Sequence, residues 1–344
     1  MPEVLEDTKR TPDTERDSST ESKIFDNMAT DLNNKTFYSN GKLLLTGEYV
    51  VLDGALSLAI PTKFGQSLQI ESVDKPILHW KSLDENGTVW FEGAFELSNN
   101  GTLKQDFDKL SLTTQFEDVA RRLFQIFNAV KQLNPDFLNV EKGYRITTAI
   151  DFPRNWGLGT SSTLINNIAQ WANVDAFKLL ERTFGGSGYD IACAQNDTPI
   201  TYQIENGSPL INQVAFDPPF KEQLYFVHLN KKQNSREGIA HYKAQNKDHI
   251  QDIISEVNII TLKMIACDAL EAFEVLVDRH ENIIAKVTNQ TPVKLLLFND
   301  FNGSIKSLGA WGGDFVLVTS KENPTAYFRD RGFETILPYV DMVL

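Results

Sequence analysis

Several short stretches in the first third of the chain are apolar or alternate between apolar and polar residues. The stretches KLLLTGEYVVL, LSLAIP and QSLQIES show this pattern, and glycines separate them. Such alternation predicts strands with one buried face. We therefore expect a small antiparallel sheet, with a hairpin turn at 85–87 between the strands ILHWKSL and TVWFEGAFEL.

Helical spacing of apolar residues first occurs over 113–133, and the strand YRITTAI follows it. A second helix is expected at 175–184. The pattern then predicts the strand QLYFVHLN, a long helical region at 247–286, a shorter helix at 292–300, the strand GDFVLVTS and a last strand near 335. This order of elements predicts an α+β second domain.

Three regions follow from these patterns. Residues 1–34 carry 9 acidic and 4 basic side chains and few large apolar ones. Such a segment buries too little surface to offset its ordering entropy, so we expect a disordered tail. We expect an N-terminal domain at 35–205 and a C-terminal domain at 206–344.

Composition narrows the possible partners. The net charge of −13 argues against a nucleic-acid-binding protein, although a local cationic pocket can still bind an anionic small molecule. The two cysteines and five histidines show no metal-ligand spacing. No apolar run is long enough to span a bilayer, and the N-terminus lacks the apolar core of a signal peptide, so we expect a cytoplasmic protein with no membrane partner.

One stretch of the sequence has features of an anion-binding site. PRNWGLGTSSTLINNIAQW, at 153–171, places two glycines and three hydroxyl side chains where a helix begins. The amides of a first helical turn lack intrahelical partners and attract anions, and glycine lets a ligand approach the backbone closely. The stretch is therefore either a capped turn or a phosphate cradle.

Two further stretches, taken with this loop, favour the cradle. NGKLLLTGEYVVLDGALSLAIP precedes the loop, and SIKSLGAWGGDFVLVT follows it. In this order the three resemble the signature motifs of the GHMP kinases, the superfamily of galactokinase, homoserine kinase, mevalonate kinase and phosphomevalonate kinase. A fourth segment, ERTFGGSGYDIACA, is similar to the stretch that supplies an aspartate in mevalonate-type members and looks closest to the bacterial group called the GYDIA family. The resemblance covers roughly residues 37–320.

The resemblance implies an α+β fold of two domains. The N-terminal one would contain a left-handed βαβ unit, and the C-terminal one would be ferredoxin-like. It also implies ATP and Mg²⁺ as cofactors and a small anionic acceptor that meets ATP between the domains. The expected activity is phosphorylation of phosphomevalonate in the mevalonate pathway of isoprenoid precursor synthesis, with mevalonate as the alternative acceptor. A non-catalytic nucleotide-binding homologue and a structural scaffold remain competing classes, and the chain is expected to be a monomer or a homodimer.

The resemblance also assigns roles to individual residues. The catalytic candidates are Asp190, as a base or a positioning group, and Lys42, whose ammonium would neutralise the transferring phosphoryl group. Ser161 and Glu181 would complete a magnesium shell. The ATP-binding loop would comprise Gly157, Leu158, Gly159, Thr160, Ser161 and Ser162; the substrate contacts would come from Glu48, Ser187, Gly309 and Gly312.

This chain departs from the family pattern at several positions. Thr160 replaces the usual first serine, Ser162 the usual alanine, and Trp311 a glycine of the third motif. The spacing from Glu181 to Asp190 is two residues shorter than in mevalonate kinase. The cations considered for binding an anionic acceptor are Arg154, Arg182, Lys63 and Arg236.

Overall fold

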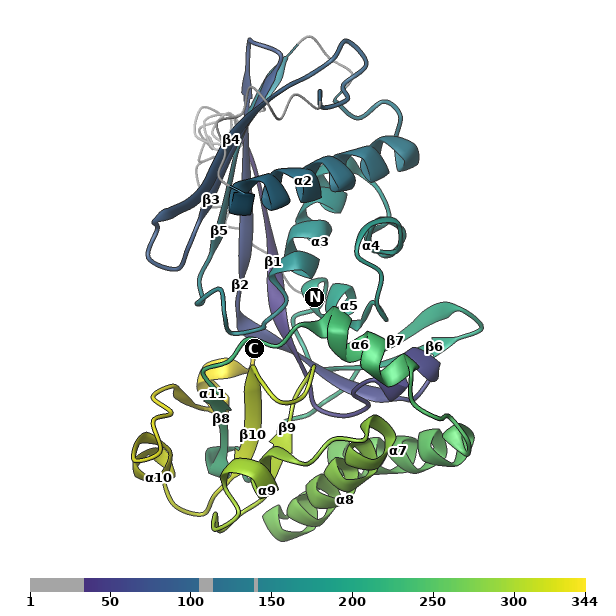
Figure 1. The fold of residues 1–344 in the computed structure, drawn as a ribbon, viewed down its shortest axis with the longest axis vertical. Helices are drawn as coiled ribbons and strands as arrows, with labels where there is room; N and C mark the ends of the chain where they lie inside the picture. The colour runs from purple at the N-terminus through teal and green to yellow at the C-terminus, as the bar shows by residue number, and fades with distance from the viewer. Residues whose placement is uncertain (1–33, 105–113, 139–141) are drawn as a thin grey trace, which may run out of the picture.

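The computed structural model describes residues 34–104, 114–138 and 142–344, so the expected tail at 1–34 lies outside the described residues except for Asn34. Two sheets organise this part of the chain, a large one in the upper half of Figure 1 and a smaller one in the lower half. The expected α+β fold is confirmed.

The large sheet has seven strands in the order β4-β3-β5-β2-β6-β7, with β1 paired to β2 outside this path. Its strands are β1 (Asn34–Leu44), β2 (Ser57–Val73), β3 (Ile77–Leu83), β4 (Val89–Glu96), β5 (Gly143–Ile150), β6 (Ile200–Glu205) and β7 (Ser208–Gln213). The hairpin expected at 85–87 is present between β3 and β4. The sequence predicted an antiparallel sheet, but β3 and β5 pair in parallel, so the observed sheet is mixed. The chain between these two strands passes through β4 and α2 (Thr114–Leu133).

Two strands expected as separate form one. LSLAIP and QSLQIES are joined in the 17-residue β2, which pairs with β1 along most of its length. Gly65 lies at the centre of this strand instead of ending it. A Cβ at Gly65 would lie 2.4 Å from the carbonyl oxygen of Ser39, so the glycine is needed because β1 passes too close for a side chain.

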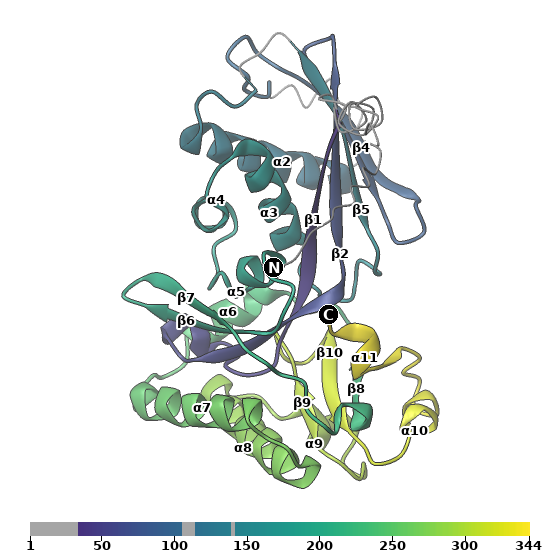
Figure 2. The ribbon, with the colours of Figure 1, turned by 180° about the vertical axis from the view of Figure 1, so that it is seen from behind.

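Helices cover one face of the large sheet, as the two views of the ribbon show (Figures 1 and 2). They are α2, α3 (Thr160–Ala172), α4 (Ala176–Thr183) and α5 (Tyr189–Ala194). Their apolar sides form a core with the inward residues of the sheet, including Trp80, Phe124 and Ile168, all nearly inaccessible to solvent. This packing fixes the N-terminus of α3 at the lower end of the sheet.

The small sheet has the order β11-β8-β10-β9, and each neighbouring pair is antiparallel. Its strands are β8 (Leu224–His228), β9 (Ile305–Ser307), β10 (Phe315–Thr319) and β11 (Ile336–Pro338). The accompanying helices are α6 (Ser235–Lys243), α7 (Ile250–Ile265), α8 (Leu270–Thr288), α9 (Val293–Leu297), α10 (Thr325–Arg329) and α11 (Tyr339–Met342). This is a ferredoxin-like strand order, as expected, with the long helical region at 247–286 divided into two helices.

The boundary between the two sheets differs from the expected position at 206. The hairpin of β6 and β7 extends the large sheet to Gln213, and the small sheet begins at Leu224. The two halves share a core in which Leu43 and Ile60 of the large sheet pack with Phe226 and Phe315 of the small one. In the described ranges, no helix is long and apolar enough to cross a membrane.

Candidate active site

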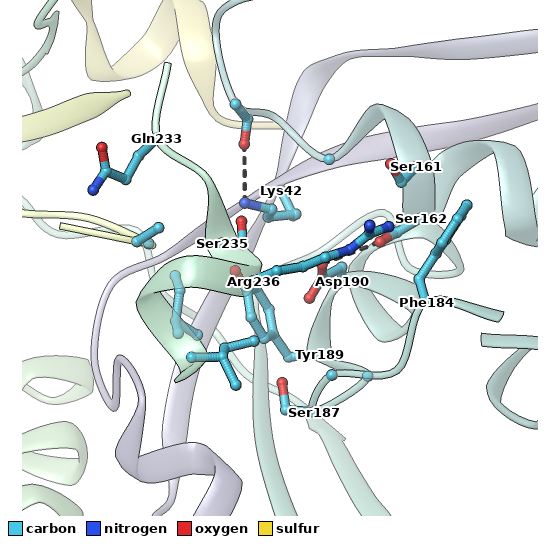
Figure 3. A pocket seen from close by; sticks show the side chains of 18 of the residues that line it. Lys42, Ser161, Ser162, Phe184, Ser187, Tyr189, Asp190, Gln233, Ser235 and Arg236 are labelled. Carbon is cyan, nitrogen blue, oxygen red and sulfur yellow. Dashed lines mark hydrogen bonds between the residues drawn. The ribbon is translucent and has the colours of Figure 1, made fainter. Parts of the chain in front are cut away.

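A pocket of about 540 Å³ opens where the two halves of the molecule meet. The N-terminal half contributes the end of β1, the 3₁₀ turn Val50–Asp53, the loop before α3 and the segment 184–190. The C-terminal half contributes 232–236, Ile239, Gly309, Ala310 and Asp314. Figure 3 shows side chains from both halves converging on this space. The motifs that are far apart in the sequence are therefore brought to one place.

The loop before α3 lines this pocket with backbone and hydroxyl groups. Gly157 and Gly159 have φ angles of 71° and 95°, in the left-handed region that favours glycine. Gly159 is the N-cap of α3, and across the described residues no side chain caps this helix. The first-turn amides and the macrodipole therefore favour an anion here. Thr160, Ser161 and Ser162 all line the pocket, and the side chain of Ser161 is exposed.

Leu158 contributes through its backbone. Its side chain is buried in the core shared by the two sheets, and its carbonyl oxygen accepts a 3.0 Å hydrogen bond from the amide of Lys42. This bond ties the loop to the end of β1. The Leu158 side chain anchors the loop and does not line the pocket.

Lys42 lies against the same loop. Its Nζ donates a 3.0 Å hydrogen bond to the carbonyl of Gly157 and lies 5.7 Å from the centre of the Tyr189 ring. A Cβ at Gly159 would lie 3.2 Å from Cγ of Lys42, so the missing side chain at Gly159 leaves room for the lysine. The lysine is half-buried and forms no ion pair with the described residues, which leaves its charge available to a phosphate.

Asp190 lies in the first turn of α5 and lines the pocket. Its Oδ2 accepts a 3.1 Å hydrogen bond from Oγ of Ser162, in the first turn of α3. The serine that replaces the family's usual alanine thus orients the carboxylate expected to act near the acceptor. Ser187, also a predicted contact, lines the pocket just before this turn.

A second carboxylate, Asp314, lines the pocket and was missed by the sequence analysis. A Cβ at Gly157 would lie 2.2 Å from Cγ of Asp314, so the carboxyl group packs directly on the loop. Oδ1 accepts a 3.1 Å hydrogen bond from the amide of Gln233. Burial raises the pKa of Asp314, and the charges of Lys42 and Lys232 oppose that rise. The only sequence signal was its place directly after the glycine turn GAWGG.

The third motif reaches the pocket in part. Gly309 lines it with a φ of 59°, whereas Gly312 is exposed and is not part of the lining. Trp311 is 1% exposed and packs beside Tyr49, behind the pocket wall. The large side chain at this usual glycine position therefore points into the core, and the predicted substrate contact from Gly312 is not supported.

The expectation that Glu48 contacts the substrate is wrong. Its side chain is fully buried and forms an ion pair with Lys306 of β9. His280 of α8 lies beside it, and Nε2 of His280 accepts a 2.9 Å hydrogen bond from the amide of Gly47. Burial lowers the pKa of His280 far below its usual range, so the ring is neutral there. Glu48 joins the two halves of the molecule behind the pocket.

Glu181 is also not part of the pocket lining. It is an exposed residue of α4, while its neighbour Leu180 contributes to the wall. The shortened spacing to Asp190 leaves the loop 185–188, rather than the glutamate, facing the cavity. Ser161 therefore has no pocket-lining partner in Glu181, and the predicted magnesium pair is not assembled by this structure.

The four cations considered for an anionic acceptor are distributed unevenly. Arg236 lines the pocket, together with Lys232, which the sequence analysis did not single out. Cζ of Arg154 lies 3.7 Å from the centre of the Trp90 ring, and Nζ of Lys63 donates a hydrogen bond to the carbonyl of Val340. Arg182 donates to the side chain of Gln132. Of the four, Arg236 remains the candidate for contact with an anionic acceptor.

Comparison with known proteins adds evidence on the fold. No protein-family model and no curated protein matches the sequence. Solved structures do match: the mevalonate kinase of Methanococcus jannaschii has a TM-score of 0.62 at 15% identity, covering 89% of this chain and 97% of that one. Phosphomevalonate kinase of Streptococcus pneumoniae, in complex with phosphomevalonate and AMPPNP, has a TM-score of 0.57 at 17% identity, covering 90% and 98%. Lactococcus lactis galactokinase complexed with galactose has a TM-score of 0.62 at 13% identity, covering 91% and 92%.

The chain has the GHMP kinase fold. The neighbours bear the names of three of the activities for which the superfamily is named, so the resemblance of the motifs and the arrangement of the elements agree. The likeness spans nearly all of the described chain.

Proposed function

We propose that this chain is an ATP-dependent kinase that transfers a phosphoryl group to a small anionic acceptor. The observation that carries the proposal is the convergence of Lys42, the glycine loop before α3 and Asp190 on one pocket between the two halves. These supply a cation for the developing charge, an anion-binding helix terminus and a carboxylate near the acceptor. A scaffold would need none of these groups to face a cavity.

Lys42 would leave the Gly157 carbonyl and donate to the transferring phosphoryl group. Because it is half-buried, its charge is screened less than that of an exposed lysine. Ser162 holds the Asp190 carboxylate in place. For an alcohol acceptor Asp190 takes the hydroxyl proton, whereas for a phosphate acceptor no proton must leave and the carboxylate positions the acceptor.

The pocket fits Mg²⁺ that arrives with the nucleotide. Among the described residues no three His, Cys, Asp or Glu side chains form a resident metal cluster, and Mg²⁺ commonly uses one or two protein ligands besides phosphate oxygens and water. The exposed hydroxyl of Ser161 would hold it, and Asp190 and Asp314 are the carboxylates that line the pocket. When bound, the ion would neutralise charge on the phosphates.

We propose phosphomevalonate as the acceptor, with mevalonate as the alternative. The support for this order is the GEYVVLDG and GSGYDIA segments together with the pocket-lining cations Lys232 and Arg236. The structural neighbours include kinases named for both acceptors. A nucleotide-binding homologue without turnover is the competing class.

Incubation with Mg²⁺-ATP and a panel of mevalonate, phosphomevalonate, homoserine and galactose tests the proposal. Product formation from phosphomevalonate above that from mevalonate is the expected result. Binding of AMPPNP in a calorimeter without product from any acceptor would favour the nucleotide-binding homologue. Absence of both binding and product would refute the kinase proposal.

A further inference from the structure

Two arginines from different halves of the molecule contact the ring of Phe184, which lines the pocket. Arg236 lines the pocket as well, whereas Arg122 lies at its rim and contacts it through this ring. Cζ of Arg122, from α2, lies 5.6 Å from the centre of the Phe184 ring. Cζ of Arg236, from α6, lies 5.4 Å from the same centre. Both guanidinium groups therefore lie within about 6 Å of one ring at the junction of the two halves, and the charge of Arg122 acts on Arg236.

Neither guanidinium has a carboxylate partner within the described ranges. In the part of the chain that the structure describes, Arg122 donates to the side-chain oxygen of its helix neighbour Gln125, and the guanidinium of Arg236 contacts the Phe184 ring. Burial and the nearby positive charge of Arg122 lower the pKa of Arg236. In a chain with 46 acidic residues and a net charge of −13, two neighbouring arginines with no carboxylate partner among the described residues are unexpected, because ordinary surface cations have abundant carboxylates to pair with.

The space beside Arg236 and Phe184 is open and suits a compact anion. Figure 3 shows Arg236 extending from α6 across the pocket to the side where Ser162, Asp190 and Phe184 lie. Gly185 and Gly186 form the neighbouring wall, and a Cβ at either position would meet no heavy atom within 4 Å. The N-terminus of α3 faces the same cavity and adds partial positive charge.

We propose that Arg122 and Arg236 form a clamp that binds a phosphate group of a ligand at the rim of this pocket, beside Phe184. The paired guanidiniums suit a dianion because each can donate two hydrogen bonds to phosphate oxygens. The phosphate belongs either to the nucleotide or to an acceptor that already carries a phosphate group. These two sources follow from the proposed kinase function, whereas phosphate binding by the clamp does not require catalysis. Since one arm comes from each half, an occupied clamp also ties the two halves together.

The test measures ligand affinity by calorimetry for Arg236→Gln and Arg122→Gln in the full chain. The ligands are AMPPNP, phosphomevalonate and mevalonate, of which the last two differ by one phosphate. Arg121→Gln is the matched control, because it removes the same charge from α2 at an exposed residue whose charge pairs with Glu117. We expect each clamp variant to weaken binding of the phosphate ligand about 10- to 100-fold, and the control to leave it within about twofold.

The pattern of loss identifies the source of the phosphate. Loss of AMPPNP affinity alone assigns the clamp to the nucleotide, and loss for phosphomevalonate but not for mevalonate assigns it to the acceptor. The clamp is overturned if both variants match Arg121→Gln for every ligand, or if the wild type binds neither phosphate-bearing ligand.

Two more readouts distinguish phosphate binding by the clamp from simple packing on the ring and from catalysis. Removing a cation that has no carboxylate partner in the described ranges should leave the melting temperature of the free protein unchanged or raise it. A fall in melting temperature with unchanged affinity would show that the arginines only pack on Phe184, and would refute the clamp. Binding that depends on Arg236 without phosphoryl transfer to any acceptor would uphold the clamp and refute the kinase. Turnover that both clamp variants leave intact would uphold the kinase and refute the clamp.

Discussion

Replacing Lys306 by methionine should destabilise the protein strongly, although the residue lies outside the pocket. The Lys306 side chain is 1% exposed and pairs with the fully buried Glu48, and its Nζ also donates a 3.0 Å hydrogen bond to the carbonyl of Ser307. A second buried carboxylate, Glu281, lies close enough for the lysine charge to act on it. The single substitution would leave Glu48 and Glu281 buried without their cation.

The magnitude follows from the desolvation of the charges that remain. Removing one partner of a buried ion pair costs about 3–5 kcal/mol, because the other charge stays in a medium that solvates it poorly. Replacing Glu48 by glutamine in the same chain removes that charge, so the double variant Glu48→Gln/Lys306→Met should recover part of the loss. We expect its cost to fall at least about 1.5 kcal/mol below the sum of the two single variants.

The assay is denaturant unfolding of the wild type, both single variants and the double variant, followed by tryptophan fluorescence and circular dichroism. The matched control is Lys321→Met, which breaks the exposed pair of Lys321 and Glu271 and should leave the midpoint nearly unchanged. The reasoning fails if Lys306→Met costs less than about 1 kcal/mol, or if the single-variant costs simply add. Either result would mean that water reaches Glu48 in the folded protein.

Three further predictions concern the pocket and the region behind it. Gly157→Ala should reduce AMPPNP affinity more than about tenfold in calorimetry, because its Cβ would overlap Asp314. Gly185→Ala is the control, since Gly185 is also at positive φ but has open space around it, and it should not reduce the affinity in this way. Equal effects of the two substitutions would contradict this reasoning. Asp190→Asn should lower kcat by about 10²-fold or more in a steady-state assay if the acceptor is an alcohol, and retention of activity with mevalonate would exclude a base role. Burial raises the pKa of Glu281 from 4.5 to about 7. The stability that its protonated form contributes is therefore fully present below about pH 4.5 and is lost as the pH rises through 7. Glu281→Gln should therefore be more stable relative to wild type at pH 8 than at pH 5, by up to about 3 kcal/mol, and a pH-independent difference in denaturant unfolding would refute this.

Much of this architecture could be predicted from local features of the sequence. The helical spacing at 113–133 and the strand at 144–150 were confirmed because periodicity reports which face of an element is buried. The ordered glycine motifs predicted the two-domain fold and the loop at 157–162, since only glycine readily adopts the backbone angles found there. Lys42 and Asp190 were assigned to the site by the resemblance of their motifs to those of the GHMP kinases, and both line the pocket.

Other features depended on contacts between distant segments. The burial of Glu48 requires Lys306, 258 residues away, and no local pattern distinguishes a buried ion-pair carboxylate from one that faces a ligand. Gly65 was taken as a break between strands because its true constraint, the close passage of β1, lies in another segment.

In the pocket wall, too, some features followed from the sequence and others from the folded structure. The resemblance of the motifs implied that the glycine turn and the loop before α3 serve one site, but the folded structure decided that Trp311 points into the core and Asp314 onto Gly157. It also turned Glu181 to solvent and brought Arg122 and Arg236 to one ring. Backbone geometry is encoded by neighbouring residues, whereas the direction and charge environment of a side chain are set by whatever the whole fold packs against it.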